Sequence, residues 1–107
     1  MINLTPHKIE VRYNGVGMTF EPSGKVARVA MIEKVEGDWA GVPVISRVAG
    51  KVEIPEVPQG EPILVSSMVL DAMRQQGIQM EAYAPDTGPT AIRENGNIVA
   101  VTRLVKL

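Results

Sequence analysis

Two arginines interrupt apolar segments of this chain, and their charge is hard to explain by folding alone. Arg28 lies within the run at residues 26–32, and Arg103 lies within residues 98–105. A guanidinium keeps its charge, so a strand that carries one toward a packed face must offer it a carboxylate, carbonyl groups or a bound anion. The sequence therefore indicates a small anion site. For each arginine taken alone, the alternatives are a subunit contact or an ion pair with Glu33, Glu36, Asp86 or Glu94.

A polar turn near the C-terminal arginine is a second candidate for anion binding. Asp86, Thr87 and Gly88 place a carboxylate, a hydroxyl and a glycine in one loop, which could cradle a phosphate through exposed N–H groups or only shape a turn. Gly24, in the break before residues 26–32, offers a similar backbone donor. Tyr83 could stack against a nucleobase beside this loop, although a tyrosine that fills the core is the usual case.

Residues that could catalyse a reaction are few. The chain has one histidine and no cysteine, so it offers neither a clear nucleophile with its base nor a metal cluster. His7 precedes the first strand, where bonding to the local backbone is the commoner role. Ser66 and Ser67 precede a helix without the Gly-x-Ser-x-Gly pattern, so capping explains them more simply. The sequence predicts a binding protein that needs no cofactor rather than an enzyme.

Length and charge narrow the kinds of partner. The 107 residues suit a single domain over residues 1–107. Eleven basic and twelve acidic side chains give a net charge of -1, without the basic excess that DNA or an anionic membrane would require. The absence of cysteine, of a signal-peptide pattern and of a long apolar run leads us to expect a soluble protein that is not secreted.

Hydrophobic periodicity predicts an α+β fold, made mainly of antiparallel strands and hairpins with one helix. The helix is expected over residues 67–76, capped by Ser66 or Ser67 and closed by Gly77. The run at 26–32 reads as a strand covered on both faces, and Arg93 near the last hairpin turn is expected to extend into water. The other expected strands span residues 9–13, 18–20, 42–48, 51–54, 63–65, 78–83, 91–93 and 98–105.

Self-association is expected from the core and the strand edges. Six methionines among few aromatic residues indicate a plastic core or an apolar assembly surface. A small β-rich domain also leaves strand edges that can pair between subunits. We therefore expect a homo-oligomer.

Several segments together resemble a family of small phage and prophage proteins, and within it the first type of Thoeris anti-defence protein. They are INLTPHKI at residues 2–9, PSGKVARV at 22–29, GVPV at 41–44, ILVS at 63–66, APDTGP at 84–89 and VTRL at 101–104. The resemblance spans nearly the whole chain.

This resemblance implies a hexameric binder in the host cytoplasm that sequesters a cyclic ADP-ribose isomer intact and so silences a bacterial TIR-domain defence. Its pockets would lie between identical subunits, with Arg28 and Arg103 in the places of the two arginines that hold the ligand's phosphates. The family also accepts cyclic oligonucleotide signals at separate sites. The alternatives are a phage structural or assembly protein, and a small hydrolase or cyclase that acts on a nucleotide.

Overall fold

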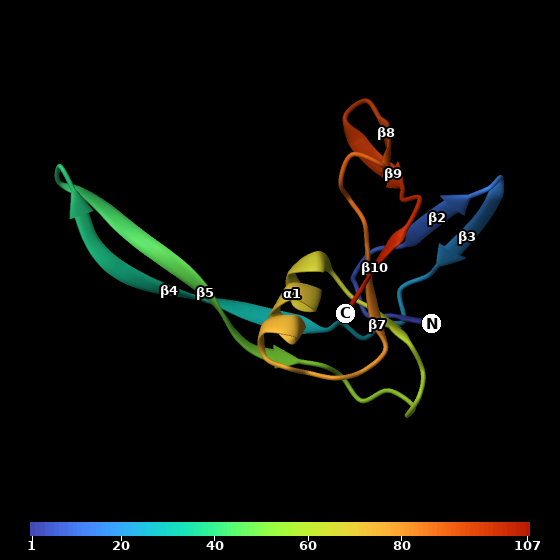
Figure 1. Ribbon diagram of the computed structural model, residues 1–107, viewed down its shortest axis with the longest axis horizontal. Coiled ribbons are helices and arrows are strands. Elements are labelled where there is room, and N and C mark those ends of the chain that lie inside the picture. The colour runs from blue at the N-terminus through green and yellow to red at the C-terminus, as the bar shows by residue number, and fades with distance from the viewer.

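One helix packs against a small mixed sheet, and three two-stranded hairpins extend from this core (Figure 1). The computed structural model describes all residues 1–107. The helix is α1 (Ser67–Gln75), and the strands are β1 (Ile2–Asn3), β2 (Ile9–Tyr13), β3 (Val16–Phe20), β4 (Arg28–Trp39), β5 (Val42–Glu53), β6 (Ile63–Leu64), β7 (Ala82–Pro85), β8 (Ile92–Glu94), β9 (Asn97–Ala100) and β10 (Leu104–Lys106).

The central sheet has the strand order β1-β6-β7-β10. The β1–β6 and β6–β7 pairs are parallel, whereas β7–β10 and all three hairpins are antiparallel. The expected α+β, mainly β fold is confirmed, and the parallel pairs are a feature that the local pattern did not reveal. The sheet thus joins segments from both ends of the chain.

Helix α1 covers this sheet with one apolar face. Ser66 is its N-cap, because the Ser66 Oγ accepts a hydrogen bond from the Val69 N–H at 3.2 Å. Gly77 follows the C-cap with φ of +68°, which suits a glycine closing a helix. The predicted helix is therefore confirmed to within one residue. Its buried side chains are Val69, Leu70, Ala72 and Met73.

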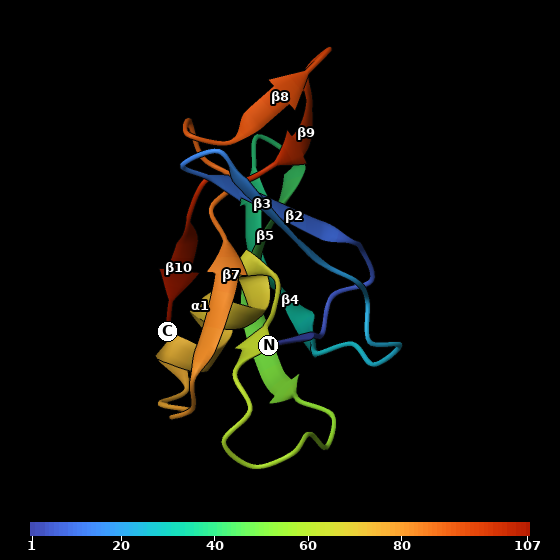
Figure 2. The same ribbon diagram turned by 90° about the vertical axis from the view of Figure 1, so that its right-hand side faces the viewer.

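Two hairpins end in Asn-Gly turns, a sequence typical of a tight hairpin connection. Asn14-Gly15 and Asn95-Gly96 both have positive φ at each residue, as a two-residue hairpin turn of the primed type requires. A bridge between Val11 and Val101 joins β2 to the segment after β9, so the β2–β3 and β8–β9 hairpins lie side by side at one end of the molecule (Figure 2).

The longest hairpin corrects two predictions. The strand expected at 26–32 begins at Arg28 and continues to Trp39 as β4. Almost all of it is exposed rather than covered on both faces. The separate strands expected at 42–48 and 51–54 form the continuous β5, with a register shift opposite Val29 and Met31. A bulge absorbs the residues around Gly50 and lets the strand continue past the expected break.

Two further strands differ from their predicted ranges. Only residues 82–83 of the expected strand at 78–83 are extended, and that strand continues to Pro85 as β7. The strand expected at 98–105 divides into β9 and β10, with Arg103 between them. The chain changes partners there, because β9 pairs with β8 whereas β10 pairs with β7.

A buried amide holds the connection after β1. The Asn3 side chain is 2% exposed, and its Nδ2 donates to the His7 carbonyl at 2.8 Å and to the Phe20 carbonyl at 2.9 Å. Its Oδ1 accepts from the backbone and hydroxyl of Thr5. Because every hydrogen-bonding atom of this amide has a partner, the network fixes the loop that leads into β2.

Candidate functional site

Arg28 opens strand β4 at the edge of a groove of about 460 Å³. Its side chain is exposed, which corrects the expectation that the strand carries it toward a packed face. Glu53 is its cross-strand partner, but the two form no ion pair. The Arg28 guanidinium is therefore free to meet a ligand. The lining residues are Ala27, Arg28, Val29, Ala30, Lys51, Glu53, Ser66, Met68 and Val69.

The groove combines two cations with the start of helix α1. Lys51 from β5 and Arg28 from β4 lie on its walls, and neither forms an ion pair within the chain. Ser66, the N-cap of α1, lies on the opposite element, where the helix dipole favours negative charge. Glu53 is the one acidic group in the lining. A groove of this volume with few charged groups is typical of a small-molecule site.

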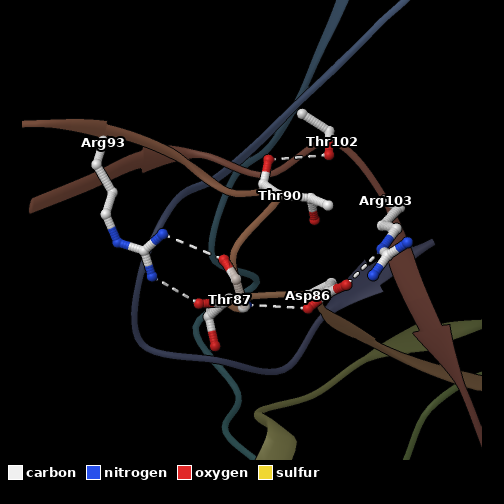
Figure 3. Close-up of polar contacts among 7 residues, drawn as sticks. Asp86, Thr87, Thr90, Arg93, Thr102 and Arg103 are labelled. Carbon is white, nitrogen blue, oxygen red and sulfur yellow. Dashed lines mark hydrogen bonds and ion pairs between the residues drawn. The ribbon is translucent and has the colours of Figure 1, made fainter.

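The second predicted region forms a compact polar turn (Figure 3). The Asp86 Oδ1 accepts a hydrogen bond from the Gly88 N–H at 3.0 Å, and its Oδ2 accepts one from the Arg103 Nε at 2.5 Å. The Asp86 N–H donates to the Arg103 carbonyl at 3.1 Å. One carboxylate therefore holds both the turn and the guanidinium, and the Gly88 N–H is already occupied.

The ion pair leaves Arg103 available rather than buried. Its side chain is 64% exposed, while that of Asp86 is 18% exposed. Only the Nε of Arg103 is bonded to Asp86, so both terminal amino groups keep their hydrogen atoms free for another acceptor. This corrects the expectation of an apolar strand environment, and of the ion pairs considered for Arg103, the one with Asp86 is present.

These contacts stabilise the charged form of the Asp86 side chain. The Arg103 hydrogen bond, followed by the Gly88 N–H, holds the pKa of the Asp86 carboxyl below its ordinary value. The carboxylate is thus stabilised in its charged form, which keeps the pair intact near neutral pH.

Arg93 reinforces the same turn from the last hairpin. Its two terminal nitrogens donate to the Thr87 carbonyl at 2.9 Å and to the Gly88 carbonyl at 3.1 Å (Figure 3). Arg93 is exposed, as expected, and its guanidinium is in addition bonded to the turn, which the sequence did not predict. The Thr102 hydroxyl also donates to the Thr90 carbonyl, which ties the residues on either side of the hairpin together.

Tyr83 and Gly24 lie apart from this turn. The Tyr83 side chain is half-buried on β7, and its hydroxyl donates to the Glu81 Oε1 at 2.9 Å. That hydrogen bond, followed by burial, raises the pKa of the Tyr83 hydroxyl. Gly24 is exposed in the loop before β4 with φ of +89° and does not line the Arg28 groove.

The structure brings together only part of the predicted site. Asp86, Thr87, Gly88 and Arg103 form one cluster, whereas Arg28 lines a groove to which none of these four contributes. Sequence reasoning missed Lys51 and the Arg93 clamp. Lys51 lies two residues before Glu53, the pairing partner of Arg28, so an antiparallel pairing of these two strands, which the sequence analysis did not assign, was the signal that could have found it.

No three carboxylate or imidazole side chains lie close enough together to hold a metal ion. Helix α1 has nine residues, far too few to cross a bilayer. Comparison with protein-family models, curated proteins and solved structures found no match to this chain.

Proposed function

We propose that the chain is a phage anti-defence protein that captures a cyclic ADP-ribose isomer without cleaving it and so blocks bacterial immune signalling. The observation that carries this proposal is a pair of exposed guanidinium groups, Arg28 and Arg103, each with donor atoms free for an anion. The proposal also rests on the sequence resemblance, which the segments around both arginines carry. Capture occurs in the cytoplasm of the infected host.

The Arg28 groove supplies one phosphate contact in this proposal. Arg28 can form two parallel hydrogen bonds to a phosphate, and Lys51 adds a second positive charge on the same wall. The N-terminus of α1 adds its positive dipole end. The apolar side chains of Val29, Met68 and Val69 give the uncharged part of a nucleotide a surface on which to pack.

Arg103 supplies the second phosphate contact. Asp86 fixes its Nε, so less conformational entropy is lost when the terminal amino groups bind an anion. Thr87 is exposed on the same turn and offers a hydroxyl donor. The Gly88 N–H is not assigned to the ligand, because Asp86 already accepts its hydrogen bond. Asp86 is therefore a positioning residue in this arrangement.

Arg103 does not line the Arg28 groove, so in this proposal a ligand that uses both arginines is held between copies. This supports a homo-oligomer, which is a hexamer in the family that the sequence resembles. Tyr83 remains the proposed stacking ring, and Gly24 a proposed backbone donor from the loop before β4. Cyclic oligonucleotide signals belong to this proposal only as a second class of ligand.

Isothermal calorimetry with purified cyclic ADP-ribose isomers tests the proposal. We expect wild-type protein to bind one isomer tightly and to release it with unchanged mass after heat denaturation, because capture involves no bond cleavage. Arg28→Ala and Arg103→Ala should each leave the oligomer intact and weaken binding at least about 100-fold, since a phosphate would lose a charged, bidentate partner.

Arg12→Ala is the matched control, because Arg12 is exposed and paired with Glu10 on β2. It should bind like the wild type. Tight binding that survives both arginine substitutions would contradict the assigned site, and release of a cleaved nucleotide would support the hydrolase alternative instead.

A phage structural or assembly protein is the second candidate. The long exposed β4–β5 hairpin favours it, because projecting apolar hairpins suit subunit assembly. Mass spectrometry of purified virions separates the two functions. Presence of the chain in particles supports the structural role, and early expression with absence from particles supports capture of a signal.

A further inference from the structure

The outer part of the β4–β5 hairpin, residues 31–48, projects away from the rest of the molecule, and we call it the distal arm (Figure 1). The radius of gyration of the chain is 16.5 Å, whereas a compact domain of this length has about 13 Å. Apart from the ladder of the hairpin itself, which continues from Met31 to Ala49, no hydrogen bond joins the arm to another element. The inner end of the arm borders helix α1, where Met31, Arg47 and Val48 share a pocket with it, and the outer end lies away from the core (Figure 1).

The exposed surface of the chain is larger than that of a typical monomer. Its accessible area is 7335 Å² for 11.6 kDa, whereas folded monomers of this mass expose about 5,800 Å². The excess of about 1,500 Å² lies in the range that each partner of an obligate complex buries, about 1,000 to 2,500 Å². The area alone therefore matches what a stable dimer contact needs.

Apolar cross-strand pairs are exposed on both faces of the distal arm. Ile32 pairs with Val48, at 54% and 56% exposure, and Val35 pairs with Ile45, at 73% and 42%. Because Ile32 and Val35 are an odd number of residues apart in a regular stretch, the two pairs point to opposite faces. Trp39, 76% exposed, lies at the tip. Burial on one face only would leave half of these side chains in water.

Some of the charged groups of the arm have partners within it. Glu33 pairs with Arg47 at 3.0 Å, and Glu36 accepts a hydrogen bond from the Ser46 hydroxyl at 2.6 Å. Asp38 accepts one from the Gly41 N–H at 3.1 Å. Glu36 and Asp38 each accept one hydrogen bond from a neutral donor and Lys34 has no partner in the chain, so a covering copy must bring opposite charges or further hydrogen-bonding groups to these three side chains.

We propose that the distal arm inserts between copies of this chain, so that a second copy covers both of its faces and Trp39 is its main anchor. We expect a second copy of the chain to cover the arm, because each copy has the same excess of accessible surface area. Each copy also has the same two arm edges without a neighbouring strand. A tryptophan at the tip is typical of an interface hot spot. This inference concerns assembly and does not depend on the ligand.

Trp39 is the only tryptophan in the chain, so its fluorescence reports directly on this interface. In the wild-type protein we expect a molar mass that is a multiple of 11.6 kDa and an indole protected from acrylamide. Dilution should lower the mass and expose the indole together. A monomer at high concentration with a freely quenched Trp39 would overturn the proposal.

The double variant Val35→Glu with Ile45→Lys removes one apolar pair and replaces it with an ion pair inside the hairpin. It should reduce the molar mass to 11.6 kDa while the far-ultraviolet circular dichroism stays unchanged. The matched control is Tyr13→Glu with Val16→Lys, an equally exposed cross-strand pair at the tip of β2–β3, which should keep the wild-type mass.

A folded Val35→Glu, Ile45→Lys protein of unchanged mass would also overturn the proposal. If this variant does not fold, the protection of Trp39 in the wild-type protein decides the question. Neither measurement uses a nucleotide, so failure here is distinguishable from failure of the proposed capture.

Discussion

At the scale of residues, the Asp86–Arg103 pair joins two parts of the chain that are 17 positions apart. An exposed ion pair adds little to stability because water competes for both charges. Its larger effect is geometric, since Asp86 also accepts the Gly88 N–H and so ties the arginine to a defined turn. Arg93 holds the same turn from its carbonyl side. Two arginines and one carboxylate thus give this exposed loop a fixed shape.

Asp86→Asn should lower the Tm modestly at neutral pH, with a difference that narrows in acid. The Asn side chain can still accept the Gly88 N–H but loses the charge that attracts Arg103. Because the folded pKa of Asp86 lies below its ordinary value, the unfolded chain takes up a proton first as the pH falls. The wild-type advantage is therefore present above about pH 4 and disappears as the pH passes through the lowered folded pKa.

Thermal unfolding of both proteins, followed by circular dichroism over this acidic range, measures that narrowing. Glu94→Gln, a change on the neighbouring hairpin outside the ion pair, is the control and should show the wild-type pH dependence in this range. A difference in Tm between Asp86→Asn and wild type that is constant with pH would contradict the assigned role of the Asp86 charge.

At the scale of elements, the sequence predicted those features that residues close together in the chain determine, such as helix caps and tight turns. The Ser66 cap, Gly77 and the Asn-Gly turns act within a few residues, so α1 and two hairpins could be read from the sequence. The exposure of the distal arm could not be predicted from the sequence, because an exposed apolar strand has the same composition as one buried in a core.

The site was predicted in part for the same reason. The turn at Asp86, Thr87 and Gly88 is local and could be read as a candidate, whereas its bonds to Arg103 and Arg93 depend on where β10 and the last hairpin fold. The exposure of Arg28 depends on which face of β4 meets the core, since Val29 packs against the core and neighbouring side chains of a strand point to opposite faces. Neither tertiary relation leaves a trace in the neighbouring residues.

Ala40→Asn should stabilise the turn at the tip of the arm by about 0.5 to 1 kcal/mol. Ala40 has φ of +50° before Gly41, and a residue with a Cβ other than Asn or Asp is strained in this conformation. The substitution gives the Asn-Gly sequence already found at the other two hairpin turns. Chemical denaturation monitored by Trp39 fluorescence measures the change.

Asn14→Ala provides the reverse experiment at the tip of β2–β3 and should destabilise that turn by a similar amount. A loss of stability on Ala40→Asn would contradict the strain assigned to Ala40.

At the scale of the whole molecule, little of the chain is shielded from water. Only 17 of 107 residues are buried, so a core of this size gives an isolated chain a small margin of stability. Association would supply the missing burial. In the proposed assembly, a neighbouring copy would cover the exposed arm and bring Arg103 of one chain toward Arg28 of another.

The Tm of the wild-type protein should therefore rise with protein concentration, since association stabilises the folded state by mass action. Differential scanning calorimetry over a range of concentrations measures the slope. The Val35→Glu, Ile45→Lys variant should melt at a lower temperature that is independent of concentration, and a concentration-independent Tm in the wild type would contradict an obligate assembly.

The central sheet sets an order of events during synthesis. β1 pairs with β6 and β7 pairs with β10, so residues 2–3 and 104–106 belong to one sheet. The nascent polypeptide cannot complete this sheet until residue 106 has left the ribosome, whereas the hairpin of β4 and β5 can form much earlier. Neighbouring ribosomes on one messenger RNA would then hold apolar hairpins close together before any core has closed, which favours pairing between chains made from the same transcript.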